Sequence, residues 1–318
     1  MDRITVKDLP IVGKGLFGTV YRLADDRIVK VANDISKPGT MERLEYEEKV
    51  AEVLYSNGIP TAQPFGLVET EDSAGVIYEM IKGQELYDFL EEHPEKSDRM
   101  IQGVADILLK LHKVNPGVDA GLLRMKDKMM SLLNANRKGL SEEEFAAKKA
   151  QYDALPERDT LVHGDLNPGN IIVRPDDSPV LIDVGSISTG HPYFEFTNMQ
   201  QPYLMLEDVA YGWDSIKEHM MKTTRTADIG EFDGRTALLK DFYDRLFKAY
   251  FRDLNENEST KVIDNLKKKA FSKAVAFYAR VSMPDEGKKK EILHELAKEN
   301  EKMQSLTGPV EDWWPVGY

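Results

Sequence analysis

The chain has 318 residues, of which 41% are hydrophobic and 31% charged, a balance that is typical of a folded protein with two domains or lobes and excludes a disordered chain. Its formal net charge of −13 argues against sequence-independent binding to nucleic acid. The sequence contains no cysteine, which excludes disulfides, thiolate catalysis and cysteine-based metal sites.

The first quarter of the chain is predicted to consist mainly of strands. Short runs of alternating apolar residues cover 11–22, 27–32 and 76–81. A single helix is expected to interrupt them over 41–56, because apolar residues recur there at helical spacing.

Three glycines follow the pattern G-x-G-x-x-G at Gly13, Gly15 and Gly18, with Val20 two residues later. The residues after Gly18 indicate a strand rather than a helix, which disfavours a dinucleotide-binding fold, and no Walker loop is present. The remaining interpretation is a flap of two strands joined by a glycine turn. Its backbone N–H groups can close over phosphates because glycine has no Cβ. The pattern is weak by itself, and an ordinary hairpin turn is the alternative.

Lys30 lies within the apolar strand 27–32, a place where a lysine usually reaches out to solvent. Glu47 shares its helical stripe with Val50 and Leu54, so it is predicted to face the sheet. A core-facing glutamate opposite a strand lysine forms an ion pair that can hold the lysine against nucleotide phosphates. Glu48 is the alternative partner, because an error of one residue in helix phase would exchange the two.

Beyond residue 82 the pattern becomes mostly helical. Amphipathic helices are predicted over 97–114, 122–152 and 207–305, the first with Ser97 as its N-cap. We therefore expect two lobes, a strand-rich one over residues 1–81 and a helical one over residues 82–318.

Within the helical half, residues 161–184 break the helical pattern. A hairpin is predicted between 171–173 and 180–184, around a turn in which Asp176 and Asp177 act as turn formers. This hairpin returns the chain to Asn170, the residue before its first strand, so that Asp183 comes to lie beside Asn170.

Asp165, Asn170 and Asp183 are thereby brought together in the prediction. Two of these oxygen-bearing side chains, with nucleotide phosphates, suit Mg²⁺. Asp165 is placed apart from the metal, where it can accept a proton from an attacking hydroxyl. Asp and Asn are also common turn residues, but the joint spacing of the three favours a site.

In these motifs the chain resembles the aminoglycoside phosphotransferase and choline kinase-type family of the protein-kinase-like superfamily. His163-Gly164-Asp165 with Asn170 stands where protein kinases have H-R-D and its Asn, and Asp183-Val184-Gly185 stands in the place of D-F-G. The glycine loop, Lys30 and Glu47 fit as well. The resemblance implies an α+β, bilobal, protein-kinase-like fold, with a small antiparallel-sheet N-lobe that contains one helix and a larger, mainly helical C-lobe.

The resemblance also implies an activity, in which the γ-phosphoryl of a magnesium-bound nucleotide, ATP in preference to GTP, moves to a hydroxyl of a small molecule. It implies that Lys30 contacts the α- and β-phosphates, that Asn170 and Asp183 hold Mg²⁺, and that Asp165 deprotonates the acceptor. The acceptor class includes hydroxylated antibiotics, amino alcohols and sugars.

The strand 76–81 is implied to be the hinge between the lobes. The backbone of Glu79 and Ile81 would contact adenine, and Tyr78 would shape the back of that pocket. His163 would brace the loop of Asp165 rather than act as a base.

The chain departs from protein kinases in two ways. Gly164 replaces their arginine, and no long activation loop or A-P-E segment follows Gly185, which disfavours a protein substrate. A protein kinase and a nucleotide-binding module without catalysis remain as alternatives. The segment 190–196 leaves the acceptor pocket undetermined.

The sequence carries no secretory signal and no apolar run long enough to cross a membrane. We therefore expect a cytoplasmic protein without membrane or nucleic acid partners, as a monomer or a homodimer.

Overall fold

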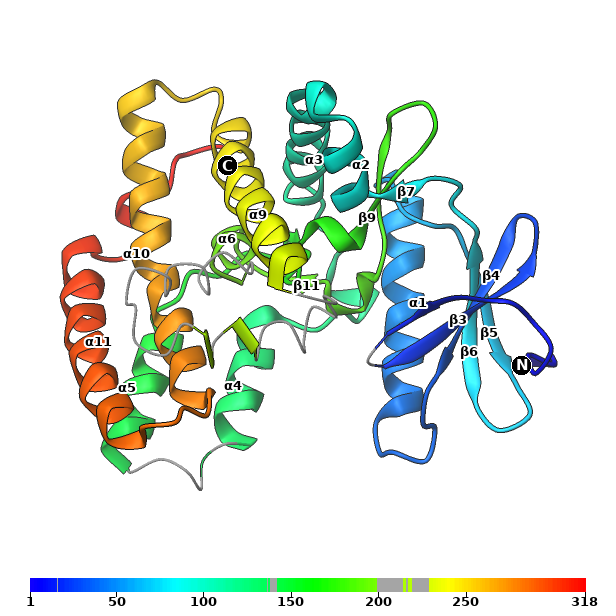
Figure 1. Ribbon diagram of the computed structural model, residues 1–318, viewed down its shortest axis with the longest axis horizontal. Coiled ribbons are helices and arrows are strands. Elements are labelled where there is room, and N and C mark those ends of the chain that lie inside the picture. The colour runs from blue at the N-terminus through cyan, green and yellow to red at the C-terminus, as the bar shows by residue number, and fades with distance from the viewer. Residues whose placement is uncertain (16, 136, 138–141, 199–213, 216, 219–228) are drawn as a thin grey trace.

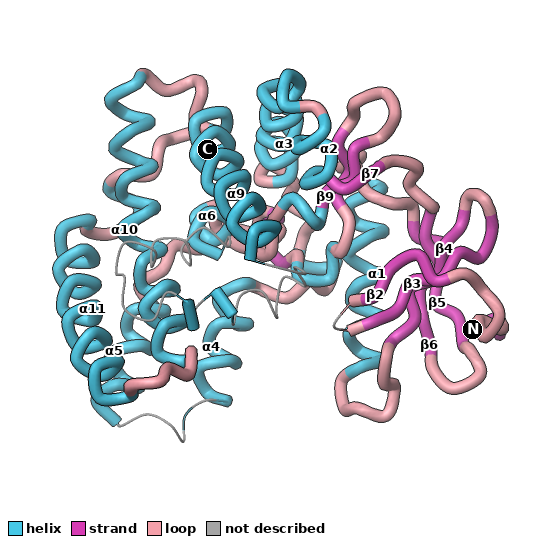
Figure 2. The backbone as a smooth tube through the Cα atoms, viewed as in Figure 1, coloured by secondary structure: helices cyan, strands magenta, loops and turns pink. Residues whose placement is uncertain are grey.

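The structure is a computed structural model that describes all residues except 16, 136, 138–141, 199–213, 216 and 219–228. In the described part, strands gather at the N-terminal end and helices dominate the remainder (Figures 1 and 2). The N-terminal strands are β1 (Asp2–Arg3), β2 (Ile11–Lys14), β3 (Gly18–Ala24), β4 (Arg27–Ala32), β5 (Pro64–Glu69) and β6 (Ala74–Glu79). They form a sheet in the order β1-β5-β6-β4-β3-β2, in which only β1 and β5 pair in parallel.

The two faces of this sheet have different partners, because side chains alternate along a strand. Val29 and Val31 of β4 pack on one face with Val68. Lys30, which lies between them, turns to the other face and reaches the helix α1 (Thr40–Ser56). The alternation therefore sends a lysine toward the helix side of the sheet.

Helix α1 buries one stripe against the sheet and confirms the predicted helix to within one residue. Leu44, Glu47, Val50 and Leu54 are buried at the spacing of three and four residues that places side chains on one face of a helix. After the helix, Gly58 adopts the left-handed conformation, at φ 65°.

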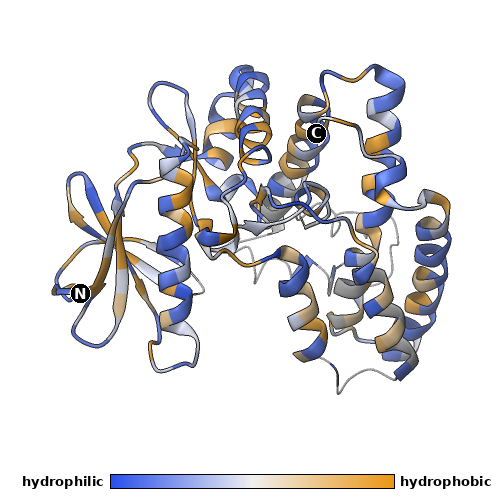
Figure 3. Ribbon diagram, turned by 180° about the vertical axis from the view of Figure 1, so that it is seen from behind, coloured by the Kyte–Doolittle hydropathy of each residue, from blue (hydrophilic) through white to orange (hydrophobic). Residues whose placement is uncertain are grey.

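The remaining described helices build the larger part of the molecule (Figure 1). They are α2 (Leu86–Glu92), α3 (Ser97–Leu111), α4 (Met125–Ala135), α5 (Glu142–Asp153), α6 (Tyr193–Asn198), α9 (Ile229–Tyr250), α10 (Glu256–Arg280) and α11 (Glu286–Thr307). Helix α3 packs on α9, and α10 packs on α11 and α6. Figure 3 shows apolar residues on the helix sides that face their neighbours and hydrophilic residues on the outer sides.

Short strands interrupt the helices where the sequence predicted a hairpin. The strands β9 (Ile171–Val173) and β10 (Pro179–Leu181) pair in antiparallel fashion, and β7 (Gln84–Glu85) adds to β9. The strands β8 (Leu161–Val162) and β11 (Ser188–Thr189) pair separately. The hairpin forms as predicted, whereas the pairing of β8 with β11 is an addition that the sequence did not predict.

The structure corrects the boundaries of two predicted helices. The helix predicted over 122–152 is two helices, since α4 ends at Ala135 and α5 begins at Glu142. Ser97 is not an N-cap, because a 3₁₀ turn over Pro94–Lys96 precedes it and the Ser97 hydroxyl donates to the carbonyl of Pro94.

Helix α3 also ends at Leu111 rather than Val114. A proline follows at residue 116, and the residue before a proline avoids the helical conformation. In the helical stretch predicted over 207–305, residues 207–213, 216 and 219–228 lie outside the described residues. The stretch contains α9, α10 and most of α11, separated by non-helical connections at 251–255 and 281–285.

Aromatic side chains fill the core around α6. Phe196 of α6 lies with its ring centroid 4.8 Å from Tyr250 and 5.0 Å from Phe247, and Trp314 packs on the same cluster. Residues Tyr193 to Thr197 of α6 are buried in this packing, which fixes the side chains that α6 directs toward the loop of Asp165. In the described part, no helix combines the length and apolarity that a membrane crossing requires.

Candidate active site

Lys30 lies between two carboxylates. Its Nζ is 2.8 Å from Glu47 Oε1 and 2.7 Å from Asp183 Oδ1. Burial alone would lower the pKa of Lys30, but the two carboxylates outweigh it and raise that pKa, so the side chain is an ammonium ion. The hydroxyl of Tyr78 donates to Glu47 Oε1 at 3.3 Å. Of the two glutamates that the helix phase allowed, Glu47 is therefore the partner of Lys30.

Asp183 reaches this position two residues after the end of β10. The amide of Ile182 donates to the carbonyl of Asn170 at 2.9 Å, which closes the hairpin, and Asp183 then takes the left-handed conformation at φ 53°. A Cβ at Gly185 would lie only 3.2 Å from Glu47 Oε2, so a glycine allows the segment to approach α1. The Asp183 side chain remains 57% exposed and presents its carboxylate outward.

The loop that carries Asp165 is held by its own amide side chains. Asn170 Nδ2 donates to the carbonyl of Asp165 at 2.9 Å, and Asn167 Nδ2 donates to the same carbonyl at 3.1 Å. Asn167 Oδ1 accepts from the amide of Gly169. Because the Asn170 amide nitrogen is directed at the backbone, its Oδ1 is the atom that can face a cation.

Asp165 itself is more basic than an ordinary aspartate. Burial raises its pKa, and the charges of Asp183 and Glu195 act in the same direction, against His163 and Lys273. A carboxylate with a raised pKa is a better proton acceptor than a fully solvated one.

A buried acid anchors this loop from behind. Glu195 of α6 is fully buried, and its Oε2 accepts from the amide of His163 at 2.5 Å. His112 Nε2 lies 3.6 Å from the same oxygen, while His112 Nδ1 is 2.8 Å from the Tyr250 hydroxyl. Burial would raise the pKa of Glu195, but His112 and His163 reverse this and keep the acid ionised.

No motif in the sequence predicted this anchor. Residues 190–196 had left the acceptor pocket undetermined. Glu195 instead faces the core, so it cannot contact an acceptor. A lone acid among Tyr193, Phe194 and Phe196 was the available signal, because a charge in an aromatic run has to be paired when it is buried.

The glycine loop joins β2 to β3. The amide of Gly15 donates to the carbonyl of Gly18 at 2.7 Å, and a Cβ at Gly18 would lie 2.9 Å from the carbonyl oxygen of Val31. Val20 pairs with Gly13 in β2 and with Lys30 in β4. The flap therefore lies directly beside the strand that carries the site lysine.

Asn33, the residue after β4, holds this loop through a contact that the sequence did not predict. Its Nδ2 donates to the carbonyl of Gly15 at 3.0 Å, and its backbone amide donates to the carbonyl of Phe17 at 3.1 Å.

Of the expected hinge residues, Glu79 is the last residue of β6 and Ile81 follows it. The amide of Glu79 already donates to the carbonyl of Gln63 at 2.8 Å, and Glu79 Oε1 accepts from Arg174 Nη2 at 3.0 Å. The backbone amide of Glu79 is therefore already occupied, which leaves its backbone carbonyl as the group that could accept a hydrogen bond from a nucleotide base. The contact of Glu79 and Ile81 with adenine stays a prediction.

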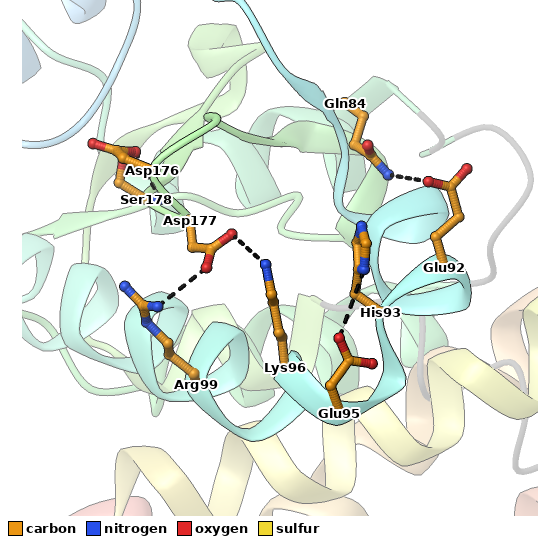
Figure 4. A network of polar contacts seen from close by, with 9 residues as sticks. All are labelled: Gln84, Glu92, His93, Glu95, Lys96, Arg99, Asp176, Asp177 and Ser178. Atoms are coloured by element: carbon orange, nitrogen blue, oxygen red, sulfur yellow. Dashed lines mark hydrogen bonds and ion pairs between the residues drawn. The ribbon is translucent and has the colours of Figure 1, made fainter.

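The turn of the β9–β10 hairpin is tied to the helical part by charge (Figure 4). Asp177 takes a left-handed conformation at φ 60°, and its carboxylate accepts from Lys96 and Arg99, each at 3.1 Å. Asp176 accepts from the amide and hydroxyl of Ser178. The two residues form the turn, as predicted, and Asp177 also fixes the hairpin that ends at Asp183.

A sequence model described as the phosphotransferase enzyme family matches residues 9–215, more than half of the chain. The chain belongs to this family. The matched range includes the glycine loop, the Lys30–Glu47 pair and the segment from His163 to Gly185, and the predicted resemblance is thereby confirmed.

Solved structures of aminoglycoside phosphotransferases share the fold. A complex of APH(2″)-IIa with streptomycin and ATP is 19% identical, with 86% of this chain and 84% of that chain covered, at a TM-score of 0.52. A gentamicin complex of APH(2″)-IIa (19% identity, 93% and 92% covered) and ADP-bound APH(2″)-Ib (19% identity, 94% of each chain covered) both give a TM-score of 0.50. No curated protein matches this sequence significantly.

Family and fold together confirm two predictions. The chain is a kinase-type phosphotransferase, and its fold is the α+β, protein-kinase-like fold, with an antiparallel-rich N-terminal sheet and a helical C-terminal region. The roles of the individual site residues stay predictions.

Proposed function

We propose that this enzyme transfers the γ-phosphoryl group of a magnesium-bound nucleotide to a hydroxyl of a small molecule. The observation that carries the proposal is the position of the Lys30 ammonium, which contacts Glu47 and Asp183 at the same time. This arrangement presents one cation to phosphates and leaves an exposed carboxylate beside it. Residues 1–81 would form the lobe that holds the nucleotide, and residues 82–318 the lobe that supplies Asp165 and the acceptor site.

The donor set suits a magnesium ion. The cluster of Lys30, Glu47 and Asp183 holds two negative charges and one positive charge, so a further cation is attracted to it. Asn170 and Asp183 offer one amide and one carboxylate oxygen, and a bound nucleotide adds phosphate oxygens, which is the composition that Mg²⁺ prefers. When bound there, Mg²⁺ would neutralise charge on the phosphates.

Each residue then has a separate task. Lys30, held by Glu47, binds the α- and β-phosphates, and the backbone amides of the loop at Gly13, Gly15 and Gly18 cover them. Asp165 accepts the proton of the acceptor hydroxyl as its oxygen bonds to the γ-phosphorus. The bond from that phosphorus to the β–γ bridging oxygen breaks, and the nucleoside diphosphate leaves.

We propose ATP as the donor and a hydroxylated antibiotic, amino alcohol or sugar as the acceptor. Structural neighbours were determined with ATP or ADP and with streptomycin or gentamicin, which makes these compounds the first to test. The hinge at Glu79 and Ile81 would hold the adenine base.

The test is the release of ADP or GDP, with magnesium present, across a panel of such acceptors. Asp165→Asn is the matched variant, because it keeps the size and polarity of the side chain while removing the base. We expect at least one acceptor to stimulate ADP release, and the variant to be slower by about 10²–10⁴-fold. An Asp165→Asn enzyme that is as active as the wild type would refute the role of Asp165. Transfer to proteins but to no small molecule would refute the acceptor class.

A further inference from the structure

Tyr46 is the residue before Glu47 on α1, and its hydroxyl joins two segments outside that helix. It donates to the carbonyl of Ile187 at 2.7 Å and accepts from the amide of Leu123 at 3.2 Å. The ring is half-buried against the core, and burial raises the pKa of the phenol to about 12, so it keeps its proton at neutral pH. One side chain thus satisfies a backbone acceptor and a backbone donor from different parts of the chain.

The first of these segments continues directly from the site. Ile187 lies four residues after Asp183, and β11 at Ser188–Thr189 then pairs with β8, which leads into the loop of Asp165. Tyr46 therefore holds the backbone that runs from Asp183 to the strand pair β8–β11, beside the start of the Asp165 loop.

The second segment leads into α4. The amide of Thr189 donates to the carbonyl of Leu123 at 2.9 Å, and Lys128 Nζ donates to the carbonyl of Ser186 at 2.8 Å. Met125, the first residue of α4, packs against the loop of Asp165, because a Cβ at Gly164 would lie 2.7 Å from Met125 Cε. Helix α4 is thus attached both to the segment after Asp183 and to the loop of Asp165.

Lys128 reinforces the same junction. Its Nζ lies 5.7 Å from the centroid of the Tyr46 ring, in addition to its contact with Ser186. The two side chains end on neighbouring carbonyls, those of Ser186 and Ile187, so they fix the backbone rather than a side chain. The arrangement links α1, the segment 186–189 and α4 into one unit.

We propose that Tyr46 is a positioning residue that couples α4 to the Lys30–Glu47–Asp183 cluster through the segment 186–189. The inference rests on the proposed nucleotide-binding role of that cluster. Binding of Mg·ATP at Lys30 and Asp183 then orders α4, and a ligand that contacts α4 strengthens nucleotide binding by the same factor, because coupling between two sites is reciprocal.

The test is amide hydrogen exchange of the full-length protein with and without Mg·ATP. In the wild type, Mg·ATP slows exchange in residues 11–32 and also in residues 122–130, by about fivefold or more, in line with typical coupling factors. Tyr46→Phe keeps the first effect and loses the second. Tyr55→Phe is the matched control, since it removes a hydroxyl from the same helix at a 48% exposed position, and it behaves as the wild type.

Lys128→Met provides a second, independent disruption that leaves Tyr46 in place, and it is expected to weaken the same protection. Protection of residues 122–130 that persists in Tyr46→Phe, or that is absent from the wild type while residues 11–32 are protected, overturns the inference and leaves the proposed function standing. Absence of protection in both regions of the wild type overturns the proposed nucleotide site and the coupling with it.

Discussion

The ammonium of Lys30 is shared by two carboxylates that come from opposite parts of the molecule. Glu47 belongs to the strand-rich part and is buried, whereas Asp183 follows β10 and is largely exposed. A buried carboxylate without its cation is costly, so Glu47 fixes the position of the lysine while Asp183 remains accessible. This difference in burial, rather than the number of charges, supports the proposal that Glu47 positions the lysine and that Asp183 binds the metal.

Replacing Glu47 should therefore affect activity far more than replacing its neighbour. Glu47→Gln removes the charge that holds Lys30, and hydrogen bonds to charged groups contribute about 1.5–3 kcal/mol. We expect kcat/KM to fall by about ten- to a hundredfold, with Glu48→Gln close to the wild type. Steady-state kinetics of both variants tests this, and equal effects of the two substitutions would contradict the assigned ion pair.

Lys128 should give the protein a distinctive dependence of stability on pH. Burial lowers its pKa from 10.5 to about 8. Between these values the unfolded chain binds a proton that the folded chain does not, so the free energy of unfolding rises with pH across this window. Lys128→Met removes the contribution. The wild-type minus variant difference, from urea unfolding at pH 7 to 10, should increase with pH above about 8, and a flat difference would argue against the lowered pKa.

At the scale of elements, the segment 161–185 consists of the Asp165 loop and the β9–β10 hairpin, and contacts from other elements hold both. The β9–β10 turn is fixed by the ion pairs of Asp177 with Lys96 and Arg99, and the loop of Asp165 is fixed by Glu195 of α6. Lys96 and Arg99 are exposed enough for water to weaken their attraction to Asp177, so the two ion pairs contribute little to stability. The contact of Glu195 is completely buried, and it is the stronger of the two supports.

Glu195→Gln tests whether Glu195 holds the loop of Asp165 in place. The change keeps the size of the side chain but removes the charge that the His163 amide and His112 face. We expect the free energy of unfolding to fall by about 1–3 kcal/mol, together with a loss of kcat, because the loop of Asp165 loses its anchor. Glu301→Gln, at an exposed position of α11, is the control and should change stability by less than about 0.5 kcal/mol. An unaltered kcat in Glu195→Gln would show that the anchor does not position the loop.

At the scale of the molecule, Lys30–Asp183 is a contact between the strand-rich and helical parts, over a sequence separation of 153 residues. The coupling through Tyr46 joins the same two parts at α1. A nucleotide that binds at this junction contacts both parts and should therefore stabilise the whole chain against unfolding.

Thermal unfolding with Mg·ATP tests this directly. At a hundredfold excess of ligand over its Kd, binding to the folded state adds about 2.7 kcal/mol and raises Tm. Asp183→Ala should lose the magnesium-dependent part of this shift and all activity, whereas Asp72→Ala, at an exposed turn, should keep both. A full shift in Asp183→Ala would contradict its role as a metal ligand.

The sequence by itself determined the parts of the site that lie close together along the chain. Asp165, Asn170 and Asp183 are brought together by one loop and one hairpin. The alternation of the strand and the stripe of the helix set Lys30 opposite Glu47 or Glu48, and the structure decided for Glu47. Turn geometry and side-chain periodicity are local properties, which residue spacing records.

Only the tertiary structure decided what holds those parts. Glu195 meets His163 and His112, and Tyr46 meets Ile187 and Leu123, across separations of 32 to 141 residues. Such contacts depend on how whole helices pack and on which polar groups are buried as a result. The periodicity of a sequence predicts which face of a helix is buried. It does not predict which element packs on that face, because packing is settled by the combined shape of all the elements.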